Sequence, residues 1–260
     1  MDRRLYYETM RNVENEKMRN FWGLRLLMTS VLITHFLVSS FSHSLNFSLS
    51  QYQNNENQRW RDSLTYLNQQ IASQPWSTDL HLRKANANLQ LKQWQYAADE
   101  YSLVLQKEPR NPAALFYRAY ANTHLRHFDL SRNDLNDLLA YLPNHFEARL
   151  SLAIVLQQLG RKQDALDQLN QTVQMHPDSA VAYAARANVE RQMKHDEAAL
   201  YDWERAEQLS PRDPLYVVSH VDLLLVLERR SEARRVLDAA VRRGIPKGML
   251  LEWYEKCTRR

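Results

Sequence analysis

Glycine and cysteine are both scarce in this chain of 260 residues, which has four glycines and one cysteine. Gly23, Gly160, Gly244 and Gly248 cannot be arranged into a glycine-rich phosphate-binding loop or a dinucleotide-binding fingerprint. The single Cys257 excludes an internal disulfide framework and a cysteine-based zinc cluster. The sequence therefore predicts no nucleotide-binding motif of this kind and no cofactor.

Catalytic signatures are also missing. No serine lies in a strained G-x-S-x-G nucleophile turn. His124 and His127 are three residues apart, with Asp129 nearby, and could form a metal pair. Two histidines without a clear third ligand are more often surface residues. We therefore predict a protein that is not an enzyme, with no catalytic residue and no metal site.

The formal net charge of +4 is unevenly distributed, because residues 228–260 carry ten Lys and Arg against five Asp and Glu. A basic end of this kind can attract nucleic acid or anionic lipid. No base-reading or aromatic stacking motif accompanies it, so the sequence favours a solvated helix face and predicts no nucleic-acid partner.

One long apolar run, residues 21–41, precedes the rest of the chain. Its uninterrupted part, from Leu26 to Phe41, is short for a membrane span of about 20 residues but matches the hydrophobic core of a signal peptide. The alternative of a buried core helix is disfavoured by the charged residues before the run and the small residues after it. We predict that residues 1–42 are a leader. It is a cleaved signal peptide if translation starts at Met18, and a retained membrane anchor if Met1 is the true start.

The charges around this run predict its orientation. Six Lys and Arg precede Leu26, and none follows until Arg59. The positive-inside rule then places the rest of the chain outside the cytoplasm, as a periplasmic or secreted protein or as a single-pass anchored one. We expect this segment to be the part of the chain that contacts the membrane. Residues 43–57 are polar and lack helical periodicity, so they predict a linker before a folded domain at 58–260.

Proline recurs in that domain with a period of 34 residues, which defines rows at 78–111, 112–145, 146–179 and 180–213, and a fifth row from Pro214. Each of the four complete rows has proline at position 32. Other positions also match from row to row. Position 8 is Ala85, Ala119, Ala153 and Ala187; position 20 is Ala97, Ser131, Ala165 and Ala199; position 24 is Tyr101, Leu135, Leu169 and Trp203.

Each row predicts two helices, at positions 1–14 and 17–31, because apolar residues recur there at helical spacing. Small residues at positions 8 and 20 let the two helices cross closely, and the large residue at position 24 fills the space between them. The proline at position 32 ends the second helix because a residue before proline avoids the helical region. Pro112 and Pro214 then suit the first position of the next helix.

This pattern resembles the tetratricopeptide repeat, which has a small residue at 8, alanine at 20, an aromatic residue at 24 and proline at 32. The resemblance implies an all-α fold, a right-handed solenoid of antiparallel helix pairs. Of the aromatic residues expected at position 4, only Tyr183 is present. Residues 59–75 are expected to form a lone second helix, and residues 246–260 a capping helix over the last apolar face.

The resemblance also implies that the first helices line a concave groove that binds a protein or peptide. The corresponding residues are Leu82, Asn86, Leu89, Gln90, Phe116, Tyr117, Tyr120, His124, Leu150, Ile154, Gln158, Asn188 and Gln192. The family's clamp for carboxylates is absent because Leu82 stands where Lys or Arg is needed. We expect a protein-protein interaction scaffold that docks a segment through its apolar and aromatic residues. The alternatives are a regulatory or adaptor subunit of an enzyme complex, or a membrane-anchored cytoplasmic adaptor.

Positions 7 and 23 carry opposite charges in three rows, as Lys84 and Glu100, Arg118 and Asp134, and Arg186 and Asp202. Row three has Leu152 and Gln168, with no charge at either position. The shared presence and absence of charge predicts an ion pair between the two helices of one repeat. As partly exposed pairs they would each contribute about 0.2–1 kcal/mol.

Overall fold

The structure, a computed structural model, describes residues 42–258, and these residues form helices without any β-strand. The chain divides into two compact units, residues 1–51 and 52–260. All helices from Thr78 onward belong to the second unit. The predicted leader at 1–42 lies outside the described residues except for Ser42. Among the described helices, none is long and apolar enough to cross a membrane.

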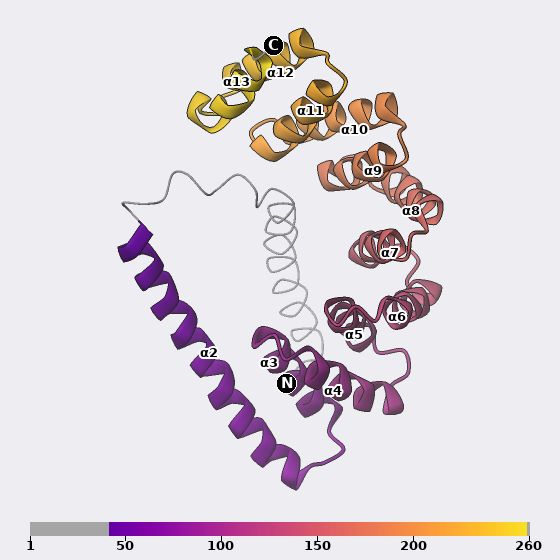
Figure 1. Cartoon of the computed structure of the whole chain (residues 1–260). Coiled ribbons are helices and arrows are strands. Elements are labelled where there is room, and N and C mark those ends of the chain that lie inside the picture. Colours follow the sequence, from indigo (N-terminus) through magenta and orange to yellow (C-terminus); the bar gives the residue numbers. More distant parts are fainter. Residues whose placement is uncertain (1–41, 259–260) are drawn as a thin grey trace. The chain divides into compact units, whose positions relative to one another are not determined.

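Ten helices of the second unit form five consecutive pairs, and each helix contacts the next along the chain (Figure 1). The pairs are α3 (Thr78–Gln90) with α4 (Trp94–Lys107), α5 (Pro112–His124) with α6 (Phe128–Tyr141), α7 (Phe146–Gln158) with α8 (Lys162–Met175), α9 (Ala180–Gln192) with α10 (Asp196–Leu209), and α11 (Pro214–Val226) with α12 (Arg230–Arg242). Each first helix occupies positions 1–13 of its row. The predicted all-α repeat of helix pairs is confirmed.

The small residues lie where the helices cross. Every side chain at positions 8, 20 and 24 of the four complete rows is at most 1% exposed. Ala153 and Ala165 show how this works in the third pair, since a larger side chain at either point would hold α7 and α8 apart. The apolar core therefore runs from repeat to repeat between the helices, and proteins of this type gain stability from neighbouring units.

The second helices end as the prolines predict. In the four complete rows the residue after the helix, Glu108, Leu142, His176 or Ser210, has φ between −133° and −120° and ψ near 70°. This conformation is outside the helical region, as expected one residue before proline. Pro112 and Pro214 lie at the start of α5 and α11, where the missing N–H leaves no helical hydrogen bond unmade.

The turn inside each pair has one geometry in all five rows. The residue two places after each first helix has positive φ, and it is Lys92, Arg126, Gly160, Lys194 or Glu228. The next residue donates its N–H to a carbonyl five residues back, as His195 does to Glu190 at 2.9 Å. This is a left-handed helix end, a conformation that glycine adopts most easily. Of these five residues, only Gly160 is of a type that indicates the left-handed conformation in the sequence.

Helix α2 (Ser42–Ser73) corrects the predicted linker at residues 43–57. That segment lacks helical periodicity, yet it continues as one helix into residues 59–73. The physical reason is that the chain has neither proline nor glycine between Gly23 and Pro75, so nothing in it terminates a helix. The second part of α2 is the expected lone second helix, with Leu67 only 1% exposed.

The C-terminal cap consists of a 3-10 helix, η1 (Lys247–Leu250), and α13 (Leu251–Thr258). Trp253 donates its Nε1–H to Asp222 of α11 at 2.8 Å, and the Tyr254 hydroxyl donates to Asp238 of α12 at 2.7 Å. Leu250 is completely buried. The cap thus covers the last helix pair, as the sequence predicts.

Candidate binding face on the first helices

The first helices place their candidate residues on one side of the repeat stack. Helix α5 contacts α7, and α7 contacts α9, in addition to their own second helices. Figure 1 shows α5, α7 and α9 following one another on the same side, with α6, α8 and α10 on the other. We call the side chains at positions 5, 6, 9 and 13 of α3, α5, α7 and α9 the first-helix face.

The predicted site residues differ in their exposure. Phe116 and Leu150 are 8% and 1% exposed, so their side chains belong to the interior and do not present a surface. Leu89 is buried as well. The remaining ten residues are half-buried or exposed, and they are Leu82, Asn86, Gln90, Tyr117, Tyr120, His124, Ile154, Gln158, Asn188 and Gln192. The interpretation of Phe116 and Leu150 as surface anchors is therefore wrong: in α5 and α7 position 5 turns toward the neighbouring helices.

An aromatic cluster forms where the first and second repeats meet. The His124 ring stacks on Trp94 with centroids 4.0 Å apart and planes 5° apart. Tyr120 meets both rings edge-on, at 4.6 Å from His124 and 5.8 Å from Trp94. Trp94 begins α4, whereas Tyr120 and His124 belong to α5. The repeat pattern gives no sign that Trp94 adjoins the face of the next repeat, because this contact joins residues of two different repeats.

A second ring contact links α5 to the start of α7. Phe116 stacks against His145 with centroids 5.6 Å apart and meets Tyr117 edge-on at 5.3 Å. Tyr117 in turn lies 6.1 Å from Tyr101 of α4. Aromatic pairs in these arrangements contribute about 0.5–1.5 kcal/mol beyond their buried area. The buried Phe116 therefore packs directly against the half-buried Tyr117.

Amide side chains flank the rings along the same face. Gln90 donates to Asn86 at 3.3 Å, and Gln192 of α9 donates to Gln157 of α7 at 3.1 Å. Gln158 and Gln192 are exposed, and Asn188 is half-buried. Amide groups offer donors and acceptors together, which suits the backbone of an extended chain.

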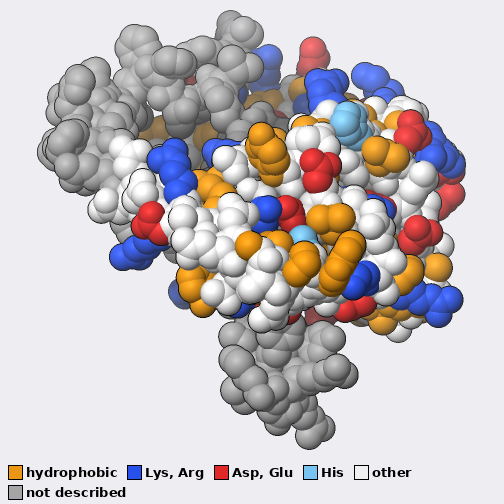
Figure 2. All heavy atoms as spheres, turned by 90° about the horizontal axis from the view of Figure 1, so that it is seen from below, with side chains coloured by type: hydrophobic (Ala, Val, Ile, Leu, Met, Phe, Trp, Pro, Cys, Tyr) orange, Lys and Arg blue, Asp and Glu red, His pale blue; other side chains and the backbone are white. Residues whose placement is uncertain are grey.

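Charge is sparse on this part of the molecule. Glu147, at the start of α7, is half-buried, and a hydrogen bond from His145 lowers the pKa of its carboxyl in spite of burial. Arg83, at position 6 of α3, is the one Lys, Arg, Asp or Glu at the positions of the first-helix face, and it lies 3.9 Å from Asp79. Figure 2 shows one face of the molecule, where hydrophobic side chains of the described residues lie among charges of both signs. The first-helix face is thus mainly aromatic, aliphatic and amide in character.

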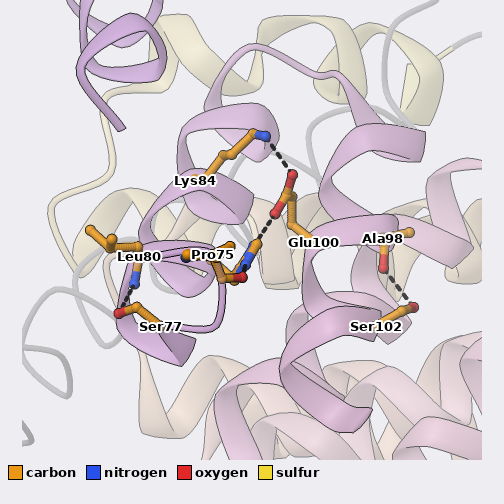
Figure 3. Close-up of polar contacts among 8 residues, drawn as sticks. Pro75, Ser77, Leu80, Lys84, Ala98, Glu100 and Ser102 are labelled. Atoms are coloured by element: carbon orange, nitrogen blue, oxygen red, sulfur yellow. Dashed lines mark hydrogen bonds and ion pairs between the residues drawn. The ribbon is translucent and has the colours of Figure 1, made fainter. Parts of the chain in front are cut away.

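The predicted ion pairs within repeats are confirmed in all three rows. Lys84 Nζ lies 2.7 Å from Glu100 Oε1, and His81 Nδ1 lies 2.5 Å from Glu100 Oε2. Figure 3 shows Lys84 of α3 reaching toward Glu100 of α4. Arg118 contacts Asp134 at 2.6 Å, and Arg186 contacts Asp202 at 2.7 Å. In row three, Arg149 donates to the uncharged Gln168 at 2.9 Å instead.

These pairs are more buried than the sequence suggests. Asp134 and Asp202 are 4% and 1% exposed. Burial raises the pKa of both carboxyls above the ordinary value, and the hydrogen bonds from Arg118 and Arg186 oppose that rise. The same arginines also reach the preceding repeat, where they contact Ser102 and Asn170, both at 3.1 Å. The position-7 arginine therefore joins two repeats, and burial makes the loss of its carboxylate partner more costly than the loss of an exposed one.

The two histidines of the possible metal pair lie in different surroundings. His124 stacks on Trp94, whereas His127 is exposed and precedes α6. Within residues 42–258, no group of three or more His, Cys, Asp or Glu side chains is placed to hold a metal ion.

Comparison with known proteins agrees with this geometry. Residues 126–189, from the turn after α5 through most of α9, match the family model of the tetratricopeptide repeat. The chain thus carries tetratricopeptide repeats in this segment. Their proline, small-residue and large-residue positions are those that the sequence matched to the family.

Solved tetratricopeptide repeat structures share the fold. A MamA structure from Desulfovibrio magneticus RS-1 superimposes with a TM-score of 0.55 at 18% identity, over 64% of this chain and 92% of that one. TTC0263, a thermophilic TPR protein of Thermus thermophilus, gives a TM-score of 0.52 at 18% identity, over 69% of this chain and 98% of that one. At this identity the likeness concerns the fold alone.

One relative of known name is a much longer protein than this chain. The DnaJ homolog subfamily C member 7 homolog of Dictyostelium discoideum is 21% identical over an alignment of 201 residues. The match covers 58% of this chain. The match spans 37% of that relative. This chain therefore matches little more than a third of the length of that relative.

Proposed function

We propose that this chain is a non-catalytic interaction scaffold that binds a protein segment on its first-helix face. The observation that carries the proposal is the half-buried aromatic cluster of Trp94, Tyr120 and His124, flanked by amide side chains and by few charges. Aromatic side chains supply most of the binding energy in protein interfaces when they enter a partner's pocket. Tetratricopeptide repeats serve generally as protein-binding modules, which supports the same assignment.

The chemistry of the face favours an extended, largely uncharged segment. Asn86, Gln90 and Gln192 can bond to a peptide backbone, while Tyr120 and Ile154 offer apolar contact. A ligand that presents a terminal carboxylate is disfavoured because Leu82 occupies the position of the clamp cation. The expected partner segment therefore binds through its backbone and its apolar side chains.

We further propose that the scaffold acts outside the cytoplasm. This rests on the sequence alone: the apolar run from Leu26 to Phe41 follows six Lys and Arg, and no further one occurs until Arg59. Mass spectrometry of the protein from cells tests the leader. An N-terminus near His43 or Leu45 supports cleavage, and an intact peptide across residues 36–50 in most molecules means that the leader is retained.

Pull-down with a matched pair of variants tests the binding face. The test variant is Tyr120→Ala with Ile154→Ala, and the control is Tyr201→Ala with Leu130→Ala. The control removes an exposed tyrosine and an exposed leucine from the second helices, at 58% and 54% exposure. Partners crosslinked in native envelopes are then quantified.

Recovery of the partner should fall by about tenfold in the test variant and stay unchanged in the control, since truncating aromatic anchors costs about 1–2 kcal/mol or more. Circular dichroism first establishes that both variants are folded. Equal recovery from a folded test variant would show that binding lies elsewhere on the molecule.

A further inference from the structure

Helix α12 has a sharp division between its two sides. Ala233, Leu237 and Ala240 are completely buried against the rest of the last repeat. Four arginines of α12 are exposed: Arg235 and Arg242 lie opposite the buried side, and Arg230 and Arg234 lie beside it, toward the cap. A helix of 13 residues thus presents four cations to solvent on the outside of the last helix pair.

These four arginines have no carboxylate within ion-pair distance among the described residues, unlike the two arginines that flank the helix. Arg229 contacts Glu197 at 2.8 Å and Glu232 at 2.7 Å, and Arg243 contacts Glu207 at 2.7 Å. The flanking arginines therefore tie the last repeat to α10. None of the four exposed arginines makes an ion pair of this kind among the described residues.

Nearby acidic groups are already engaged, with one exception. Arg229 donates two hydrogen bonds to Glu232, at 2.7 and 2.8 Å. Asp238 accepts the Tyr254 hydroxyl, and Glu252 lies 2.7 Å from Lys256. Glu228 is exposed and adjoins the start of α12. The positive potential of the helix is therefore only partly cancelled.

The basic side of α12 continues into the cap. The Tyr254 ring lies 5.6 Å from the Arg234 guanidinium and 5.2 Å from the Lys247 ammonium, so both cations are held beside one ring. Met249 and Leu251 follow shortly after Lys247 and are 56% and 52% exposed. The C-terminal end of the domain thus carries exposed cations and exposed apolar side chains together.

We propose that this cap surface, formed by the four α12 arginines with Lys247, Met249 and Leu251, docks on an anionic phospholipid bilayer. Arginine and lysine are attracted to acidic headgroups, and neighbouring apolar side chains enter the boundary between headgroups and acyl chains. A nucleic acid is disfavoured because Trp253 and Tyr254 are buried and cannot stack on bases. An acidic polypeptide would use the charges but would leave Met249 and Leu251 without a role. The assignment does not depend on the first-helix face.

Vesicle sedimentation with the full-length protein tests this surface. One set of vesicles is phosphatidylcholine alone, and the other contains about one third phosphatidylglycerol. The charge variant is Arg230→Gln, Arg235→Gln and Arg242→Gln, which spares Arg234 beside Tyr254. The matched control is Lys92→Gln, Arg110→Gln and Lys194→Gln, three exposed cations away from the cap. A third variant combines Met249→Ser with Leu251→Ser.

The charge variant should partition onto the anionic vesicles at least about tenfold more weakly than wild type, with little change on neutral vesicles. The control should keep wild-type partition, and the Met249→Ser/Leu251→Ser variant should bind anionic vesicles more weakly at matched salt. Residues 1–41 are the same in all variants, so a difference between two variants comes from the substituted residues. If the charge variant and the control bind anionic vesicles equally weakly, binding depends on the net charge of the protein and not on the cap surface. That result would overturn the proposal.

A parallel binding measurement with a polyglutamate peptide distinguishes an acidic polypeptide partner from an anionic bilayer. If wild type shows no preference for anionic vesicles, yet binds polyglutamate through the same three arginines, the surface recognises acidic polypeptides and the bilayer assignment is wrong. Circular dichroism verifies that each variant is folded before either measurement.

Discussion

Arg186 holds Asp202 with two hydrogen bonds of 2.7 Å, one from Nε and one from Nη2, although the two residues lie in different helices of the fourth repeat. Asp202 is only 1% exposed, and the arginine also donates to Asn170 of the preceding repeat. A fork of this kind fixes the angle between two helices and the spacing between two repeats. It is therefore a point at which a single substitution should loosen the stack.

We expect Asp202→Ala to lower the free energy of unfolding by about 2–3 kcal/mol, because it leaves a partly buried guanidinium without its carboxylate. Urea denaturation measures the change. Asp167→Ala is the control, since Asp167 is exposed on α8 and should matter by less than about 0.5 kcal/mol. Equal effects of the two substitutions would mean that the pair contributes no more than a surface charge.

The left-handed turn inside each repeat gives a second prediction. Lys194 has φ of 67°, and Gly160 has φ of 75° at the equivalent place. Lys194→Gly should raise the free energy of unfolding by about 0.5–1 kcal/mol, and Gly160→Ala should lower it by about 1 kcal/mol, because only glycine adopts this conformation without steric cost. No atom lies within 4 Å of a Cβ placed on Gly160, so the effect of Gly160→Ala is conformational and not a clash. Thermal unfolding of both variants should show shifts of opposite sign, and shifts of the same sign would contradict the argument.

The close crossing of α7 and α8 gives a third prediction, which concerns the space between the two helices. Ala153→Leu should cost about 1–3 kcal/mol, since the added atoms have no space between helices whose position-8 residue is 1% exposed. Ala140→Leu, at an exposed site on α6, is the comparison and should change stability little. Urea midpoints of the two variants provide the measurement. A stable Ala153→Leu protein would mean that the helices can separate without loss of packing.

The lowered pKa of Glu147 predicts how stability depends on pH. A carboxyl whose folded pKa is depressed contributes stability that is present above its unfolded pKa, ordinarily 4.5, and is lost as the pH falls through the folded value. Wild type should therefore lose more stability than Glu147→Gln when the pH falls from neutrality through this range. Urea titrations at several pH values measure the difference, with the exposed Glu204→Gln as control. Parallel curves for wild type and Glu147→Gln would refute the role of this carboxyl.

The sequence by itself determined the repeat. A period of 34 residues places the same residue types at the same points of every helix pair, so the helices, their proline-marked ends and the ion pair of Arg186 with Asp202 could all be inferred from spacing. These are local or repeated relationships, and repetition makes them recognisable without coordinates. The turn at Lys194 could not be recognised, because a lysine gives no sign of a left-handed conformation.

Tertiary structure alone decided which side chains of the first helices reach the surface. Leu150 and Ile154 lie one turn apart on α7, yet Leu150 is buried and Ile154 is half-buried, because exposure depends on how the neighbouring repeats are rotated against the helix. The stacking of Trp94 on His124 joins residues of different repeats for the same reason. Helical periodicity specifies the apolar side of each helix, but only the packing of one repeat on the next determines how much of that side remains open.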